Sequence, residues 1–135
     1  MLLLTNSAEQ TVQPGAEVVY NVIAMKTGCA ECTLRGTGLV KMKASGIYLV
    51  SFGANVTGDT AGTPVQLAFR LGGSAIIPGT TMIYTPATAN AFSNVSKTIH
   101  VTNRNCMVDT ISVVNTGTTP ITIGANPSFD IRRDA

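Results

Sequence analysis

The stretch that decides the fold is Gly46–Val56, which reads GIYLVSFGANV. Side chains alternate between the two faces of a β-strand, so the residues from Tyr48 to Val56 at every second position share one apolar face. The opposite face carries Ile47 and Leu49, and both faces of this strand are therefore expected to leave water. In a two-layer sandwich only one face of a sheet meets the core. The second apolar face consequently predicts contact with another chain.

A second segment, Val65–Leu71, has the pattern of a strand with one wet side. Its large apolar residues share one face, and Gln66 and Arg70 lie on the other, which is typical of a strand in an outer sheet. The two segments together predict a core built from alternate positions of both strands. The expected core residues are Tyr48, Val50, Phe52, Val65, Leu67 and Phe69.

The segment Val108–Val114 resembles the decisive stretch because it is apolar on both faces. Ile111 and Val113 lie on one side, and Val108 and Val114 lie on the other. By the same reasoning, this second double-sided strand is expected to need cover from a partner molecule.

The rest of the chain indicates an all-β module without internal repeats. Alternation with a period of two recurs between Gly, Pro and Asn turn signals, whereas apolar spacing of three and four residues is absent. Short strands at this spacing predict a sandwich or jelly roll. The expected strands are Glu17–Met25, Leu39–Lys43, Ile47–Val56, Val65–Leu71, Ala75–Ile77, Phe92–Val101, Val108–Val114, Ile121–Ile123 and Ser128–Arg132.

Composition excludes several classes of partner. The chain has 135 residues, of which 44% are hydrophobic and 12% charged, and its mean hydropathy of +0.28 is high for a monomer of one domain. The net charge of +2 leaves no basic stripe for a row of phosphates, so nucleic acid is not an expected partner. No apolar run approaches the roughly 18 residues of a membrane span, and residues 1–7 have neither a signal peptide's nor an anchor's pattern. No membrane contact is expected.

The ordered motifs resemble a known group of jelly-roll proteins. Gly46–Phe52 resembles the Gly-x-Tyr strand of tumour-necrosis-factor-like ligands, complement-type globular heads and the C-terminal domain of spore-surface collagen-like glycoproteins. Val65–Leu67, followed by Gly72-Gly73 and Ile77-Pro78-Gly79, is similar to the bacterial branch. The run from Val113 to Gly117 that leads to Pro127–Arg133 is similar to it as well. The resemblance covers residues 44–133.

The resemblance implies a jelly roll of about ten strands that assembles as a homotrimer around a threefold axis. It implies that the Tyr48 side of the decisive strand points into the sandwich, and that Ile47 and Leu49 point toward neighbouring subunits. Residues 16–135 are expected to form this domain, and residues 1–15 a strand or an attachment segment. Asn103–Met107 stands where the bacterial pattern has a Gly-Asp turn, and the sequence has no collagen-like stalk.

The sequence offers little for catalysis. His100 is the only histidine and thus the only unperturbed general base near neutral pH. There is neither a Gly-x-Ser-x-Gly elbow nor a glycine-rich phosphate loop, and the seven carboxylates are scattered. We expect no enzymatic activity and a solvent-exposed histidine at the edge of a strand.

The three cysteines leave alternatives open. Cys29 and Cys32 have the two-residue spacing of half a zinc site, which Cys106 and His100 could complete as a Cys₃His set. Cys106 could instead form a disulfide with one of the other two, or all three thiols could stay reduced. The family resemblance adds a fourth arrangement, in which three copies of one cysteine gather near the threefold axis.

Asp59 is the remaining candidate ligand. Acidic loops bind calcium in complement-type heads, and Asp59 follows Gly58 in the loop after the decisive strand. An aspartate beside glycine is also an ordinary turn former, which is the interpretation we favour. Apart from structural zinc or calcium, no cofactor is expected.

The sequence therefore predicts a non-enzymatic trimeric structural or adhesive display module. A phage virion surface is the expected location, as a head or tail fibre or decoration protein that contacts other virion proteins. One alternative is the head domain of a bacterial spore or cell-surface glycoprotein. A second alternative is a ligand or lectin that binds a receptor or a glycan.

Overall fold

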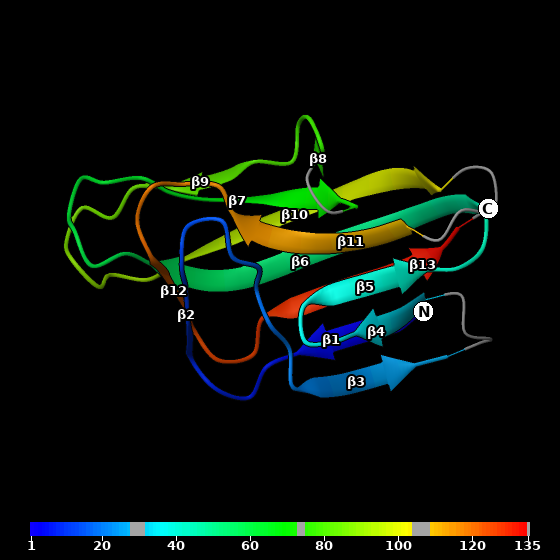
Figure 1. The fold of residues 1–135 in the computed structure, drawn as a ribbon. Coiled ribbons are helices and arrows are strands. Elements are labelled where there is room, and N and C mark those ends of the chain that lie inside the picture. The colour runs from blue at the N-terminus through cyan, green and yellow to red at the C-terminus, as the bar shows by residue number, and fades with distance from the viewer. Residues whose placement is uncertain (28–31, 73–74, 104–108, 135) are drawn as a thin grey trace.

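Two antiparallel β-sheets pack face to face in the protein, as a computed structural model shows (Figure 1). The structure describes residues 1–27, 32–72, 75–103 and 109–134. These residues form strands and turns, and they contain no helix long and apolar enough to cross a membrane. The all-β fold predicted from the sequence is confirmed.

Sheet A is the layer at the back of Figure 1. Strand β6 (Gly46–Thr57) is central, and β10 (Ser93–Asn103) pairs with it along its whole length. The other side of β6 pairs with β12 and β13, which makes it the longest and most fully paired strand of the sheet. The order continues as β2 (Gln10–Val12), β12 (Ile121–Ile123), β6, β13 (Ser128–Arg133), β1 (Leu2–Thr5) and β3 (Val22–Lys26).

Sheet B is the layer in front. Its order is β4 (Cys32–Arg35), β5 (Leu39–Met42), β11 (Asp109–Asn115), β7 (Val65–Leu71) and β8 (Ala75–Ile76), and β9 (Met82–Tyr84) also pairs with β7. The chain passes from sheet A to sheet B and back along β10, β11 and β12, which is the crossing pattern of a jelly roll. Both termini lie at one end of the sandwich (Figure 1).

Most of the predicted strands occur within one or two residues of their expected bounds. Val65–Leu71 and Ile121–Ile123 match as predicted, and the decisive stretch becomes β6. Residues 1–15 contribute two strands to sheet A, because β1 pairs between β13 and β3 and β2 pairs with β12. The strands β4 and β9 are absent from the expected set, and β1 and β2 lie in the segment 1–15 for which the sequence left a strand or an attachment segment open.

The expected single strand Glu17–Met25 is wrong, because the chain changes sheets within it. Glu17 makes an isolated bridge to Val114 in sheet B, whereas the strand in sheet A begins only at Val22. Between them, the Gln10 side chain binds the backbone of Val19 twice: Nε2 donates to the carbonyl at 2.9 Å, and Oε1 accepts from the amide at 3.0 Å. These bonds replace the ladder that a continuous strand would have made.

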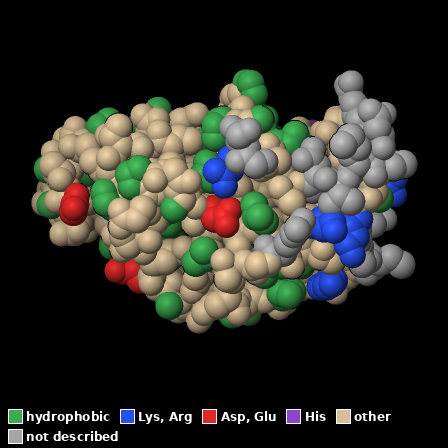
Figure 2. Space-filling view, viewed as in Figure 1, with side chains coloured by type: hydrophobic (Ala, Val, Ile, Leu, Met, Phe, Trp, Pro, Cys, Tyr) green, Lys and Arg blue, Asp and Glu red, His purple; other side chains and the backbone are tan. Residues whose placement is uncertain are grey.

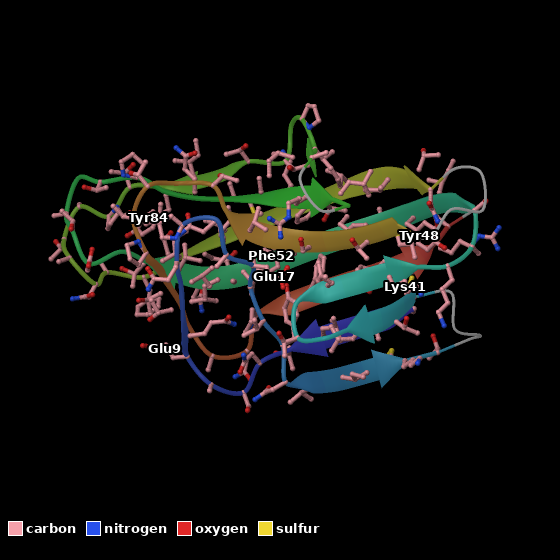
Figure 3. The ribbon with its side chains drawn as sticks, viewed as in Figure 1. Glu9, Glu17, Lys41, Tyr48, Phe52 and Tyr84 are labelled. Atoms are coloured by element: carbon pink, nitrogen blue, oxygen red, sulfur yellow. The ribbon has the colours of Figure 1, made fainter. Side chains whose placement is uncertain are left out.

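The core lies between the inward faces of the two sheets. All six residues predicted for it, three from β6 and three from β7, are at most 2% exposed. Figure 3 shows Phe52 near the centre of the sandwich and Tyr48 toward the end that holds the termini. The Tyr48 hydroxyl donates a hydrogen bond of 2.7 Å to the carbonyl of Ala44, so its buried polar atom is satisfied.

The outward face of β11 is covered by the same chain, so the prediction that this face needs a partner molecule is wrong. Val114 and Ser112 are buried there. Glu17 lies beside Val114, and its carboxylate pairs at 3.4 Å with Arg70, which lies opposite Ser112. The ion pair therefore spans the strand. Figure 2 shows this side of the molecule, where hydrophobic side chains are scattered rather than gathered in one patch. Val108 lies outside the described residues.

Tyr20 carries a buried hydroxyl with no hydrogen-bond partner among the described residues. Burial, with a smaller contribution from the negative charge of Glu17, raises the pKa of Tyr20 well above its ordinary value of 10.0. The folded chain therefore keeps this phenol neutral at a pH at which the unfolded chain ionises it. The stability linked to this group is complete below pH 10 and falls as the pH rises further.

Replacing Tyr20 with phenylalanine is expected to raise the free energy of unfolding by up to about 1 kcal/mol at neutral pH, because it removes an unsatisfied polar atom without opening a cavity. Above pH 10 the variant is also expected to lose less stability than the parent, because phenylalanine has no hydroxyl that ionises in the unfolded chain. Urea unfolding at neutral and at alkaline pH measures both effects. A Tyr20→Phe protein much less stable than the parent would contradict the absence of a partner for this hydroxyl.

Candidate functional site: the outer face of sheet A

The outward face of β6 carries apolar side chains that the described part of the chain leaves partly uncovered. Ile47 is 40% exposed and Leu49 is half-buried, whereas the alternate residues of the same strand are buried in the core. The register places Thr102 and His100 of β10 beside them. Strand parity thus puts Ile47 and Leu49 on the face opposite the core, and their contact with a neighbouring subunit stays a prediction.

The middle of this face is polar, but its side chains are paired with one another. Ser51 and Thr98 share a hydrogen bond of 2.9 Å across β6 and β10. Asn94 donates a bond of 3.3 Å to the side-chain oxygen of Asn55 farther along the same two strands. Each of these side chains thus has a hydrogen-bond partner within the chain, which it can keep if another chain covers the face.

His100 lies at the Ile47 end of the same face. Its Nε2 lies 3.3 Å from a carboxylate oxygen of Asp134, and both side chains are about half exposed. The backbone amide of Asp134 donates a bond of 2.7 Å to the carbonyl of Ile47, which fixes the C-terminal segment against β6. Among the described residues the His100 ring binds no serine, so the arrangement is a surface histidine–carboxylate contact beside the apolar strand and lacks the serine of a nucleophilic triad.

Comparison with solved structures places this geometry in a known fold. Eiger, a TNF of S. frugiperda, superposes with a TM-score of 0.75 at 15% identity over 99% of this chain and 91% of its own. The globular domain of the zebrafish complement 1qA protein has a TM-score of 0.66 at 15% identity, covering 98% of each chain. Murine APRIL has a TM-score of 0.66 at 16% identity, covering 97% of this chain and 96% of its own. The chain has a TNF-like jelly-roll fold.

At these identities the likeness shows the fold alone. No protein-family model and no curated sequence matches the chain. The resemblance that the sequence analysis found for the TNF and complement heads is thereby confirmed at the level of the fold. The Gly-x-Tyr strand of the motif is β6, which is the central strand of sheet A.

The TNF-like sandwich does not bring two of the predicted metal ligands together. Cys32 of β4 is 5% exposed and belongs to the core between the sheets, whereas His100 points away from the core on the far side of sheet A. Cys29 and Cys106 lie outside the described residues. Within the described parts of the chain, no group of three potential metal ligands occurs. The state of the three cysteines stays a prediction that metal analysis and a thiol count can test.

Asp59 sits in the exposed turn that follows β6. One of its carboxylate oxygens accepts a hydrogen bond of 3.1 Å from the Thr60 hydroxyl, the local contact expected of a turn former. No second carboxylate joins it in a ligand group among the residues that the structure describes. Its calcium role receives no support from this geometry.

Sequence reasoning missed a groove at the open edge of the TNF-like sandwich, between β9 and β10. The groove has a volume of about 280 Å³. Its lining residues are Thr81, Met82, Ile83, Asn94, Val95, Ser96 and Lys97. The signal available in the sequence was Lys97, a lysine at a position of the Phe92–Val101 strand where alternation requires an inward-facing side chain.

Proposed function

We propose that the protein is a non-enzymatic display and binding module that assembles as a homotrimer through the outer face of sheet A. The observation that carries the proposal is the exposure of Ile47 and the partial exposure of Leu49 on the most fully paired strand of the sheet. Covering apolar surface stabilises an assembly by about 25 cal/mol per Å² before association entropy is subtracted. The TNF-like fold supports a trimer because the family resemblance implies threefold assembly.

We place this trimer on a phage virion, as a head or tail fibre or decoration protein. The sequence resemblance to bacterial jelly-roll heads supports this location, and threefold assembly matches the symmetry of fibres and of local positions on capsids. The termini lie at one end of the sandwich and the loops 58–64, 85–92 and 116–120 lie toward the other (Figure 1). One end can thus attach while the other meets a partner. Capsid and tail genes next to the gene would favour a virion, and spore-coat genes a spore surface.

The homotrimer is tested by sedimentation equilibrium of the full chain. We expect a particle of three times the 14.0 kDa chain mass, because covering the outer face of sheet A in a closed ring leaves no further copy to bind. A mass that stays at a single chain across the accessible concentration range would contradict the proposal. A mass that grows without limit would also contradict it, since it would indicate open association.

A further inference from the structure

Positive charge gathers at the end of the sandwich that holds the termini. Figure 2 shows lysine and arginine side chains at the right of the molecule, the side on which Figure 1 marks both termini, and Figure 3 shows Lys41 there. Apart from Arg70 and Lys97, every lysine and arginine whose side chain the structure describes lies at this end. These residues, which we call the basic end, are Lys26, Lys41, Lys43, Arg132 and Arg133.

The strand register brings the basic end together from distant parts of the chain. Arg133 lies opposite Tyr48 near the start of β6, and Lys26 ends β3 beside the N-terminal strand β1. Asn103, the last residue of β10, donates hydrogen bonds of 3.2 and 3.0 Å to the carbonyls of the two residues that flank Lys43. The charge at this end is thus a product of the fold, and the net charge of +2 does not reveal it.

The loop end of the sandwich carries the opposite sign. The loops 58–64, 85–92 and 116–120 contain no lysine or arginine, and Asp59 is exposed in the first of them. Glu9 is also exposed, and Figure 3 shows it away from the basic end. β6 alone has 12 residues and spans about 40 Å, several times the Debye length of about 8 Å at physiological salt. The two ends therefore act on their surroundings independently.

Few carboxylates offset the basic end among the residues whose side chains the structure describes. Asp134 is the carboxylate described there, and it lies 3.3 Å from His100. Lys26, Lys43 and Arg132 are exposed, and the ion pairs found among the described residues involve none of them. Exposed cations of this kind meet an acidic surface at a small desolvation cost, and their attraction steers the encounter.

Exposed methionine side chains accompany the charge. Met25 is 45% exposed and precedes Lys26, and Met1 is 37% exposed, with its carbonyl bound at 2.9 Å by the amide of Thr27. A phosphate backbone offers little apolar surface to these side chains, whereas a protein surface does, and methionine adapts to varied protein surfaces. Both methionines belong to or adjoin the paired strands β1 and β3, unlike the amphipathic helices that lie in a membrane interface. The chemistry of the basic end therefore favours a protein partner.

We propose that the basic end docks on an acidic protein surface of the particle that displays the module. This inference rests on the proposed display function and names the partner of the end that attaches. The proposed homotrimer repeats the basic end three times, so contacts that are weak in one copy combine into tight binding. The loop end, where Glu9 and Asp59 are exposed, is repelled by the same surface and stays turned away from it.

Poly-L-glutamate, an acidic polypeptide, is the probe for this partner, and isothermal titration calorimetry of the full chain measures its binding. We expect the parent to bind it at low salt and to lose affinity as salt rises. The double variant Lys26→Gln and Lys43→Gln is expected to bind at least about tenfold more weakly. The matched control is Ala61→Glu with Thr118→Glu, which lowers the net charge by the same amount at exposed positions of the loop end and is expected to bind as the parent does. Circular dichroism verifies that each variant is folded.

Equal losses in the two double variants, or no loss in either, would overturn the assignment to the basic end. A DNA duplex and vesicles of phosphatidylglycerol in phosphatidylcholine are titrated at the same concentration of negative charge, and stronger binding to either would overturn the choice of a protein partner. Sedimentation equilibrium reports the homotrimer separately. A trimeric parent that does not bind poly-L-glutamate would overturn this inference alone, whereas a monomeric parent that binds it through Lys26 and Lys43 would overturn the homotrimer.

Discussion

Replacing Phe129 with alanine is expected to lower the free energy of unfolding by about 3–5 kcal/mol, a large part of the total stability of a domain of this size. Phe129 is fully buried at the meeting point of the aromatic core. Its ring stacks on Tyr20 at 5.5 Å between centroids, meets Phe52 edge-on at 6.2 Å and lies 6.1 Å from Phe69. Truncation removes all three contacts and leaves a cavity between sheets A and B.

The matched control is Phe92→Ala, because Phe92 is 48% exposed immediately before β10. The same change in chemistry there is expected to cost less than about 1 kcal/mol. Urea unfolding at one fixed protein concentration measures both variants, since association couples stability to concentration. Equal losses for the two variants would contradict the central place of Phe129 in the core.

The fold was predictable to the extent that it is encoded in local alternation. The β6 and β7 segments alternate over seven residues or more, which is long enough for the period to separate the core face from the outer face. The strands for which the sequence predicts no bounds are short: β2 and β9 have three residues each, and β1 and β4 have four. An alternating pattern has little statistical meaning over so few positions.

Long-range pairing lies beyond what periodicity contains. β1 is held between β3 and β13, and its partner β13 is almost the whole chain away. The break in the expected Glu17–Met25 strand involves Gln10, whose side chain binds Val19 from β2, and β2 is itself paired with the distant strand β12. Neither contact can be predicted from the residues of one of its two segments taken alone.

The candidate site was predictable only in part, for a related reason. Parity placed Ile47 and Val114 equally well on outward faces, but it does not tell which outward face the chain covers for itself. Glu17 and Arg70 cover the face that carries Val114, through an ion pair between distant segments. No such segment covers Ile47 among the described residues.

Replacing Leu49 with aspartate is therefore expected to give a folded single subunit at concentrations at which the parent is trimeric. In the isolated chain the register partners of Leu49 are His100 and Arg132, so a carboxylate there gains a favourable cross-strand neighbour. In the assembly the change removes the burial of the leucine's remaining exposed surface, which is only part of the about 1.5–3 kcal/mol for a whole side chain, and adds the larger cost of desolvating a charge. A loss of about 3 kcal/mol weakens association by roughly a hundredfold.

Leu39→Asp is the matched control, because Leu39 of β5 is likewise half-buried but lies on the outward face of sheet B. Arg70→Asp would be a less suitable control, because Arg70 forms an ion pair with Glu17. An aspartate in its place would put a second carboxylate beside that of Glu17. Sedimentation of both variants beside the parent separates loss of assembly from loss of folding. If Leu49→Asp stays trimeric, sheet A does not carry the contact. If Leu39→Asp dissociates as well, sheet B contributes to the contact. This comparison is informative because both variants replace a half-buried leucine with aspartate and differ only in the sheet that carries it.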